Sequence, residues 1–374
     1  MSLRARFAAL QRRTQLSWSI VLIVAAVCAL RLALPYIVKD YVNGRLHRLD
    51  SYDGRVADID IGLWRGAYRI DGIEIVKTGA KQPTPFFDSQ RVDLSVEWRS
   101  LLHGKLVAEA HFFDPKLNLV EGPTASQSQT GTEEDWHDRL EELFPFRFNT
   151  IEVHDGTLTF RTPGIAVGDA LIARHVDGII TNINNVEHTG KDAFAEFRMT
   201  GKVLGGADTW VYGSAEPFTK QSTFDLNLGL EHVSVPQVNP WLREYLKADA
   251  KRGDFDLYLE VASADGRYKG YAKPILQNVQ FVSLEKTVKH PLKGLWNAVV
   301  QLAAELFENQ PHKQVAAKIP FQGTVQGTST DLLATITSVL RNAFLGAFAH
   351  SIEGSISMKD VGESDGSDGS GDSR

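Results

Sequence analysis

The stretch Phe224-Asp225-Leu226-Asn227-Leu228-Gly229-Leu230 decides the fold, together with its counterpart Phe255-Asp256-Leu257-Tyr258-Leu259-Glu260-Val261. Both place an apolar residue at every second position, which is the spacing of a strand with one buried face. Similar runs recur along the chain, separated by the turn pairs Asp155-Gly156, Gly205-Gly206 and Asp265-Gly266. The sequence therefore predicts a mainly β, largely antiparallel fold with few helices.

An apolar run near the N-terminus predicts a membrane anchor. It extends over 16–38, follows four arginines, and has Trp18 and Tyr36 near its ends. A helix of this length crosses about 30 Å of hydrocarbon. The arginines place residues 1–15 in the cytoplasm and the bulk of the chain beyond the membrane. A cleaved signal peptide is the alternative, but the residues after the apolar core form a poor cleavage site.

Composition excludes several classes of protein. The chain has 374 residues and a net charge of -6, and its basic residues are scattered among acidic ones, so no nucleic-acid-binding surface is expected. The single cysteine, Cys28, lies inside the apolar run. The exported part is therefore expected to be stable without an intramolecular disulfide or a cysteine-based metal cluster.

The chain divides into segments by composition and by helix signals. Thr132 resembles an N-cap and Pro145 a stop for a short amphipathic helix, and two longer helices are expected after Pro291 and after about Asp331. The expected segments are a β segment over 42–120, a loop with the short helix over 121–145, a continuing β region over 146–285, a cap of helices and strand over 286–353, and a disordered acidic Gly/Ser tail over 354–374.

Strong catalytic motifs are absent from the sequence: it has no Walker loop, no His-Glu-x-x-His and no Gly-x-Ser-x-Gly. Asp58 and Asp60 share one strand face and would hold a cation with Glu74 or another acid, but a solvated strand face is favoured. His154 and Asp155 fall in a predicted hairpin turn. We expect no metal, no cofactor and no enzymatic activity.

The apolar face of a long sheet with few helices must be hidden by curling, by a second sheet or by an apolar ligand. A curved β-groove would suit acyl chains, since each buried methylene contributes about 0.8 kcal/mol. A sandwich-like sheet with a sealed core is the alternative. The candidate lining residues share the apolar face of their strands: Leu94, Val96, Trp98, Leu226, Leu228, Phe255, Leu257 and Leu259.

Several stretches resemble AsmA-like proteins, in particular an AsmA-related family described only as a domain of unknown function. The resemblance rests on 54–75 (GRVADIDIGLWRGAYRIDGIEI), 92–106 (VDLSVEWRSLLHGKL) and 114–119 (DPKLNL), and it continues at 239–246, 253–260 and 270–274. The larger members of this family are several times longer. This chain is therefore not expected to span a cell envelope unaided.

The resemblance implies an inner-membrane anchor and a periplasmic groove related to bridge-like lipid transfer proteins. It further implies a role in phospholipid transport or outer-membrane homeostasis in a Gram-negative bacterium, and it carries over no catalytic residues. The expected partners are a phospholipid or other acyl lipid, the inner membrane, and an envelope protein or a second copy of the chain. The alternative function is a non-catalytic envelope scaffold or assembly factor.

Overall fold

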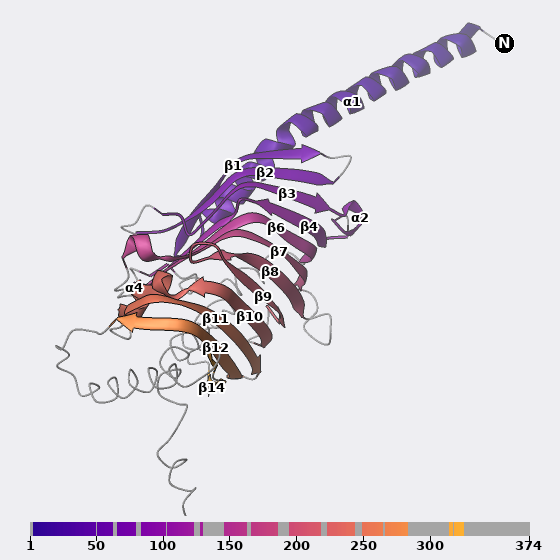
Figure 1. Ribbon diagram of the computed structural model, residues 1–374. Helices are drawn as coiled ribbons and strands as arrows, with labels where there is room; N and C mark the ends of the chain where they lie inside the picture. Colours follow the sequence, from indigo (N-terminus) through magenta and orange to yellow (C-terminus); the bar gives the residue numbers. More distant parts are fainter. Residues whose placement is uncertain are drawn as a thin grey trace, which may run out of the picture.

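A long N-terminal helix leads into one large, twisted sheet in the computed structural model (Figure 1). The structure describes residues 3–49, 51–62, 66–79, 84–101, 103–122, 128–129, 146–162, 166–185, 194–217, 223–243, 249–264, 266–282, 314–316 and 318–324. Most of 121–145 and 286–353 and all of 354–374 lie outside the described residues. The helices predicted in the first two segments and the tail predicted in the third therefore lie outside them too.

In the described part of the chain the helices are few and, apart from the first, short. They are α1 (Leu3–Leu46), α2 (Trp98–Leu101), the 3-10 helices η2 (Val167–Asp169) and η4 (Val235–Val238), and α4 (Asn239–Trp241). The strands of the first half are β1 (Tyr52–Gly62), β2 (Ala67–Lys77), β3 (Phe87–Val96), β4 (Leu106–Phe113), β5 (Lys116–Val120), β6 (Phe146–Arg161) and β7 (Leu171–Asn184). Those of the second half are β8 (Ala195–Val203), β9 (Ala207–Ala215), β10 (Phe224–Ser234), β11 (Asp249–Ala264), β12 (Arg267–Val282), β13 (Gln314–Ala316) and β14 (Ile319–Thr324).

The strands follow one another across the sheet in the order β1-β2-β3-β4-β6-β7-β8-β9-β10-β11-β12-β13, and β14 also pairs with β12. All described pairings are antiparallel except those of β6 with β4 and with β5. This parallel step falls where the chain passes through 121–145. The predicted mainly β, largely antiparallel fold is thus confirmed, as a single mixed sheet rather than two stacked ones.

Helix α1 extends to Leu46, beyond the predicted end of the membrane anchor at 38. The β region accordingly begins at Tyr52 and not at 42, which corrects that boundary. The reason is packing: the side chains of Leu34, Val38 and Val42 recur on one face of the helix and pack against an apolar cluster on β1. This contact keeps the chain helical after the apolar run ends.

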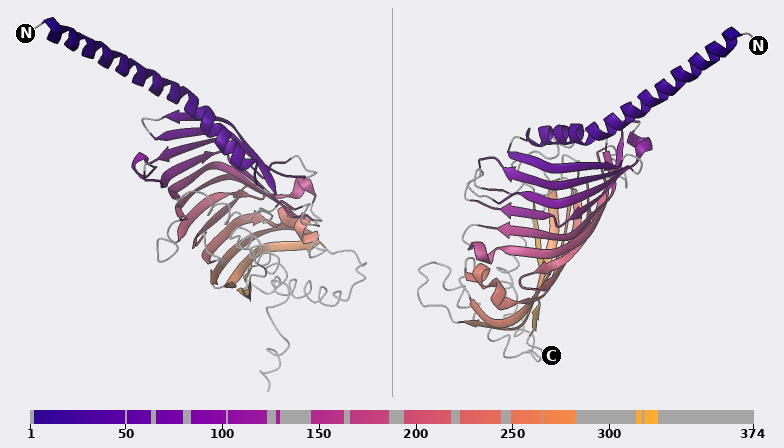
Figure 2. Two further views of the ribbon diagram at one scale, coloured as in Figure 1. Left: turned by 180° about the vertical axis from the view of Figure 1, so that it is seen from behind. Right: turned by 90° about the horizontal axis from the view of Figure 1, so that it is seen from above.

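The part of α1 from Val21 to Leu46 contains an 18-residue window with a mean hydropathy of 2.4 and is long enough to cross a membrane. It is the one such helix in the described part of the chain. Residues 21–33 are exposed. The structure is therefore consistent with a single-pass anchor that continues without a break onto the edge of the sheet (Figure 2).

The pair Asp155-Gly156 does not form a hairpin, which corrects the turn prediction. It lies inside the 16-residue strand β6, where Asp155 has a φ of 54° and the register with β7 shifts. Opposite it on β7, His175 has a φ of 51° and its Nδ1 lies 2.7 Å from Asp155 Oδ1. These residues form a bulge, which bends and twists the strands at this point. The other two predicted turn pairs do fall between strands, at β8–β9 and β11–β12.

Several glycines within the sheet lie directly opposite aromatic residues. Gly213 pairs with Phe197, and a Cβ at Gly213 would lie 2.9 Å from the Phe197 Cζ and 2.0 Å from the Asp225 carbonyl oxygen. Gly229 likewise pairs with Trp210, whose indole occupies the space above it. The missing side chains let the rings lie flat on the sheet, which keeps its surface closely packed.

Candidate functional site

One face of the sheet carries unbroken rows of apolar residues from one edge to the other. In the first row each residue pairs directly with the next: Ile61, Tyr68, Leu94, Ala110, Ile151, Ile180, Phe197, Gly213, Leu226, Val261, Gly270 and Phe321. The second row consists of Ile59, Ile70, Val92, Phe112, Val153, Gly178, Met199, Val211, Leu228, Leu259 and Ala272. We call this side of the sheet the apolar face.

These rows matter because they stay continuous between β4 and β6, where the pairing changes from antiparallel to parallel. With neighbouring strands about 4.8 Å apart, a row across eleven or twelve strands is about 50 Å long. A strand slipped by one residue would put a polar side chain into both rows. The register therefore builds one apolar strip across the whole sheet.

The two ends of the apolar face are packed. At the β1 end, the side chains of α1 cover Val56, Ile59 and Ile61, which are at most 5% exposed. At the other end, residues from η4 and the chain after it join Phe255 and Leu257 in a cluster of buried residues. Each end is thus a closed hydrophobic core.

The middle of the apolar face is more open than its ends. We define the central apolar surface as Phe112, Ile151, Val153, Ile180 and Met199, which come from β4, β6, β7 and β8. All five are half-buried, and none belongs to a cluster of fully buried residues. A strip of partly exposed apolar side chains therefore lies between two packed ends, and an apolar ligand could contact it.

The predicted lining residues divide between the packed and the open parts. Leu226, Phe255, Leu257 and Leu259 are between 1% and 3% exposed and belong to packed clusters. Leu94 and Val96 are half-buried and belong to none of these clusters, whereas Leu228 is half-buried but packs against two of them. Sequence alternation identified residues of this face, but it did not identify the central apolar surface, because burial depends on what packs over each strand.

Trp98 is not on a strand, which corrects the predicted extent of that segment. Strand β3 ends at Val96, and Trp98 begins α2. Its indole lies 6.3 Å from the ring of Tyr68, measured between centroids. Burial raises the pKa of the Tyr68 hydroxyl, because its charged form would lose hydration there. The phenol therefore stays neutral at this end of the apolar face.

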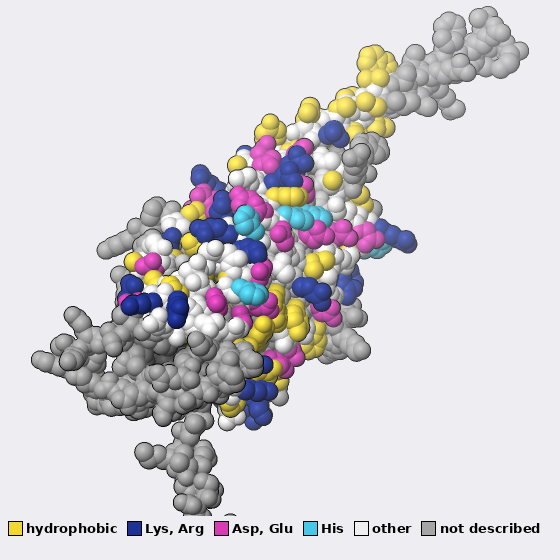
Figure 3. Space-filling model, viewed as in Figure 1, with side chains coloured by type: hydrophobic (Ala, Val, Ile, Leu, Met, Phe, Trp, Pro, Cys, Tyr) yellow, Lys and Arg dark blue, Asp and Glu magenta, His cyan; other side chains and the backbone are white. Residues whose placement is uncertain are grey.

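The opposite face of the sheet is polar. Figure 3 shows acidic, basic and histidine side chains intermixed over the middle strands. One directly paired row contains Asp60, Arg69, Asp93, His111, Glu152, Ile179, Arg198, Tyr212, Asn227, Glu260 and Tyr271. Opposite charges alternate over part of this row, as in the contact of Arg69 Nε with Asp93 Oδ1 at 3.2 Å. This side of the sheet, which we call the polar face, is suited to water.

The less favoured interpretation of Asp58, Asp60 and Glu74 as a cation site is not supported among the described residues. Glu74 binds Arg55, with its Oε2 2.7 Å from Nη2, and Asp58 lies 3.9 Å from the ammonium of Lys39. Instead, the polar face gathers His111, Glu152 and His154, whose ligand atoms all lie within 4.8 Å of one another. The sequence signal was the spacing of Glu152 and His154 by two residues, which the assignment of a hairpin turn at 155 concealed.

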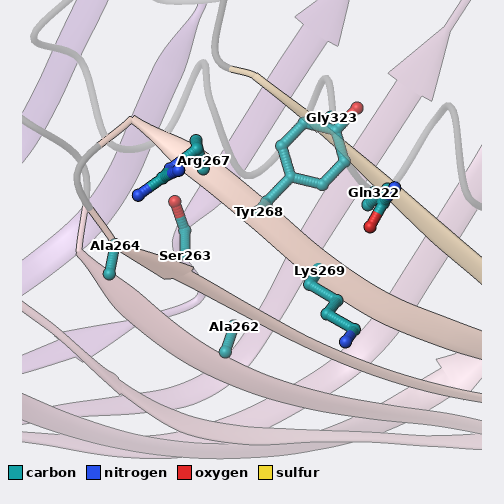
Figure 4. A pocket seen from close by; sticks show the side chains of 8 residues that line it. All are labelled: Ala262, Ser263, Ala264, Arg267, Tyr268, Lys269, Gln322 and Gly323. Atoms are coloured by element: carbon teal, nitrogen blue, oxygen red, sulfur yellow. The ribbon is translucent and has the colours of Figure 1, made fainter.

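A depression of about 550 Å³ lies at the β11–β12 hairpin, next to β14 (Figure 4). Arg267 and Lys269 contribute exposed cationic side chains, and the half-buried ring of Tyr268 lies over Gly323. It is at the end of the sheet farthest from α1 and is separate from the central apolar surface.

The chain has no match among protein-family models and none among curated proteins.

Proposed function

We propose that this chain is an AsmA-like, single-pass protein of a bacterial inner membrane that binds lipid acyl chains on the apolar face of a periplasmic sheet. In this proposal the protein takes part in phospholipid transport or outer-membrane homeostasis and has no enzymatic role. The observation that carries it is the strip of apolar residues that runs across the sheet, accessible at Phe112, Ile151, Val153, Ile180 and Met199.

The position of the strip relative to the anchor supports this function. The apolar rows begin at Ile59 and Ile61 on β1, and these are the residues against which α1 packs as it leaves the apolar span. Because α1 covers these two residues, a lipid tail would enter beside the helix and meet the half-buried Leu94 and Phe112 farther along the rows. The four arginines before the span support a cytoplasmic N-terminus and a periplasmic sheet.

The energetics of such a surface suit transport. Each methylene removed from water contributes about 0.8 kcal/mol, so an acyl chain binds through the sum of many weak contacts. The rows present similar residues at each strand, and a chain that moves by one strand spacing of about 4.8 Å exchanges equivalent contacts. The total binding free energy is then large, while the free-energy change for each move along the rows is small.

Lipid photo-crosslinking tests this proposal with a pair of neighbouring positions. Ile180 lies on the central apolar surface, whereas Ile179 is 41% exposed on the polar face of the same strand. A benzophenone amino acid is placed at either position in the full chain, and intact cells are irradiated. We expect lipid adducts at position 180, identified by mass spectrometry, and only background at 179. Equal adduct formation at the two positions would reject the proposal.

The scaffold function is the second candidate, and the packed end at β10–β12 favours it. Phe255 and Leu257 are at most 2% exposed there and leave no room for a ligand. If the whole apolar face serves as a core in the cell, the benzophenone at position 180 will give adducts with protein and none with lipid. The same experiment therefore separates the two functions.

A further inference from the structure

We propose that His111, Glu152 and His154 form a binding site for a divalent transition-metal ion, with Zn²⁺ as the fitting ion. The site lies on the polar face, on the two strands β4 and β6 that pair in parallel. It is independent of the lipid-binding function, because the central apolar surface lies on the opposite side of the same strands.

The distances match a tetrahedral ion. Glu152 Oε2 lies 3.2 Å from His111 Nδ1 and 3.2 Å from His154 Nε2. With metal–ligand bonds of about 2.0 to 2.1 Å, two ligands of a tetrahedral zinc are about 3.3 Å apart. The ligand nitrogens of the two imidazoles lie within 4.8 Å of each other, so these nitrogens need to approach by about 1.5 Å at most.

The ligand set is one that zinc uses. Two imidazoles and one carboxylate leave a fourth position for water or for an oxygen of an external ligand, as in open zinc sites. Imidazole donors favour zinc and its neighbours over Mg²⁺ and Ca²⁺, which prefer oxygen ligands. The site is therefore expected to discriminate between these two groups of ions.

Neighbouring residues hold the imidazoles in place. The ring of His154 stacks on Phe113 at 5.0 Å, and the ring of His111 lies parallel to that of His154 at 5.9 Å, with an interplanar angle of 2°. The guanidinium carbon of Arg91 lies over the ring of Phe113, 3.8 Å from its centroid. This stack restricts the motion of the rings, so less conformational entropy is lost when they bind a metal ion.

The carboxylate of Glu152 is available to a cation. The nearby arginines, Arg69 and Arg91, contact Asp93 at 3.2 and 3.4 Å. Among the described residues, no lysine or arginine forms an ion pair with Glu152; its described ion-pair partners are the two histidines. Among the described residues the carboxylate thus has no lysine or arginine as a competing partner, and its negative charge favours a divalent ion.

Metal binding to the full chain tests the site. The protein is purified in detergent micelles without a histidine tag and stripped with a chelator, and Zn²⁺, Co²⁺ and Mg²⁺ are added in turn. We expect one Zn²⁺ per chain in competition with a chromophoric chelator, visible absorption typical of tetrahedral Co²⁺, and no competition by Mg²⁺. Zn²⁺ should also raise the midpoint of thermal unfolding, because it binds the folded state.

Single substitutions then assign the ligands. His111→Gln, Glu152→Gln and His154→Gln should each weaken Zn²⁺ binding by at least about 100-fold, more than loss of an outer-shell partner costs. The matched control is His175→Gln, an exposed histidine beside Asp155, which should leave Zn²⁺ affinity unchanged. Circular dichroism of the metal-free variants verifies the fold. Wild-type affinity no higher than that of the His111→Gln/His154→Gln double variant would overturn the proposal, as would equal loss in His175→Gln.

Discussion

The side-chain amide of Asn43 on α1 forms two hydrogen bonds with the backbone of Val56 on β1, as a neighbouring strand would. Its Oδ1 accepts from the Val56 N–H at 2.7 Å, and its Nδ2 donates to the Val56 carbonyl at 3.4 Å. The neighbouring turns of the helix add the contacts of Lys39 with the Ala57 carbonyl and of His47 with Asp53. The helix thereby covers the free edge of β1, which would otherwise present unpaired backbone groups.

The same arrangement occurs near the other end of the sheet. Asn239 of α4 accepts from the Ala250 N–H at 2.8 Å and donates to the Ala250 carbonyl at 2.9 Å. In both places an asparagine amide takes the role of a peptide group beside a strand. These two residues therefore form a natural pair for comparison.

Replacing Asn43 by alanine should loosen the joint between the anchor and the sheet. The change removes two hydrogen bonds at a half-buried site, and we expect a loss of about 1 to 2 kcal/mol in the free energy of unfolding. Limited trypsin digestion should then cut faster after Arg45 and Arg48, which follow in the chain. Thermal unfolding of the full chain in detergent measures the loss of stability.

Asn239→Ala is the control for this prediction. It should cost a similar amount of stability, because the lost contacts are the same, yet leave cleavage at Arg45 and Arg48 unchanged. If Asn43→Ala does not accelerate cleavage, or if both variants accelerate it equally, the amide of Asn43 does not hold the joint.

Local patterns predicted the type of element but not the contacts made across the sheet. The alternation at 224–230 and 255–261 was sufficient to identify β10 and β11, because a strand with one buried face imposes a period of two. The role of Asn43 was hidden, since it depends on how far α1 runs past the edge of β1. A hydrogen bond of this kind leaves no periodic signal.

The cluster of His111 with Glu152 and His154 was hidden for two physical reasons. An Asp-Gly pair tolerates positive φ both in hairpin turns and in strand bulges, so Asp155-Gly156 was wrongly assigned to a turn. In addition, His111 meets Glu152 only through the parallel pairing of β4 with β6, which joins residues on either side of 121–145. Such a register cannot be derived from a single strand.

Charged substitutions should separate the packed end of the apolar face from its open middle. Leu257 is 1% exposed, so Leu257→Asp buries an unpaired carboxylate and should cost more than about 4 kcal/mol, enough to prevent folding. Ile180 is half-buried on the central apolar surface, and Ile180→Asp should leave a folded protein because its side chain reaches water. Yield of folded protein and resistance to protease measure both effects. A folded Leu257→Asp variant would show that the cluster around Leu257 is open to solvent.

Glycine substitutions should report how closely the sheet is packed. A Cβ at Gly213 would lie 2.0 Å from the Asp225 carbonyl oxygen, so Gly213→Ala must displace backbone and should destabilise the protein by about 2 kcal/mol or more. Gly44→Ala is the matched change in α1, where nothing lies within 4 Å. It should stabilise by up to about 1 kcal/mol through helix propensity. Thermal unfolding compares the two variants, and equal midpoints would contradict the packing described around Gly213.

The single cysteine should report the membrane position of α1 directly. Cys28 lies in the apolar span, so in native vesicles it should react slowly with a membrane-impermeant maleimide and react fully only after denaturation in dodecyl sulfate. The control is Ala264→Cys in a Cys28→Ser background, because Ala264 is exposed at the β11–β12 hairpin. In spheroplasts this position should react without denaturant, since the sheet is expected on the periplasmic side. Equal labelling rates at 28 and 264 would reject the span, and labelling of 264 only in inside-out vesicles would reject the orientation.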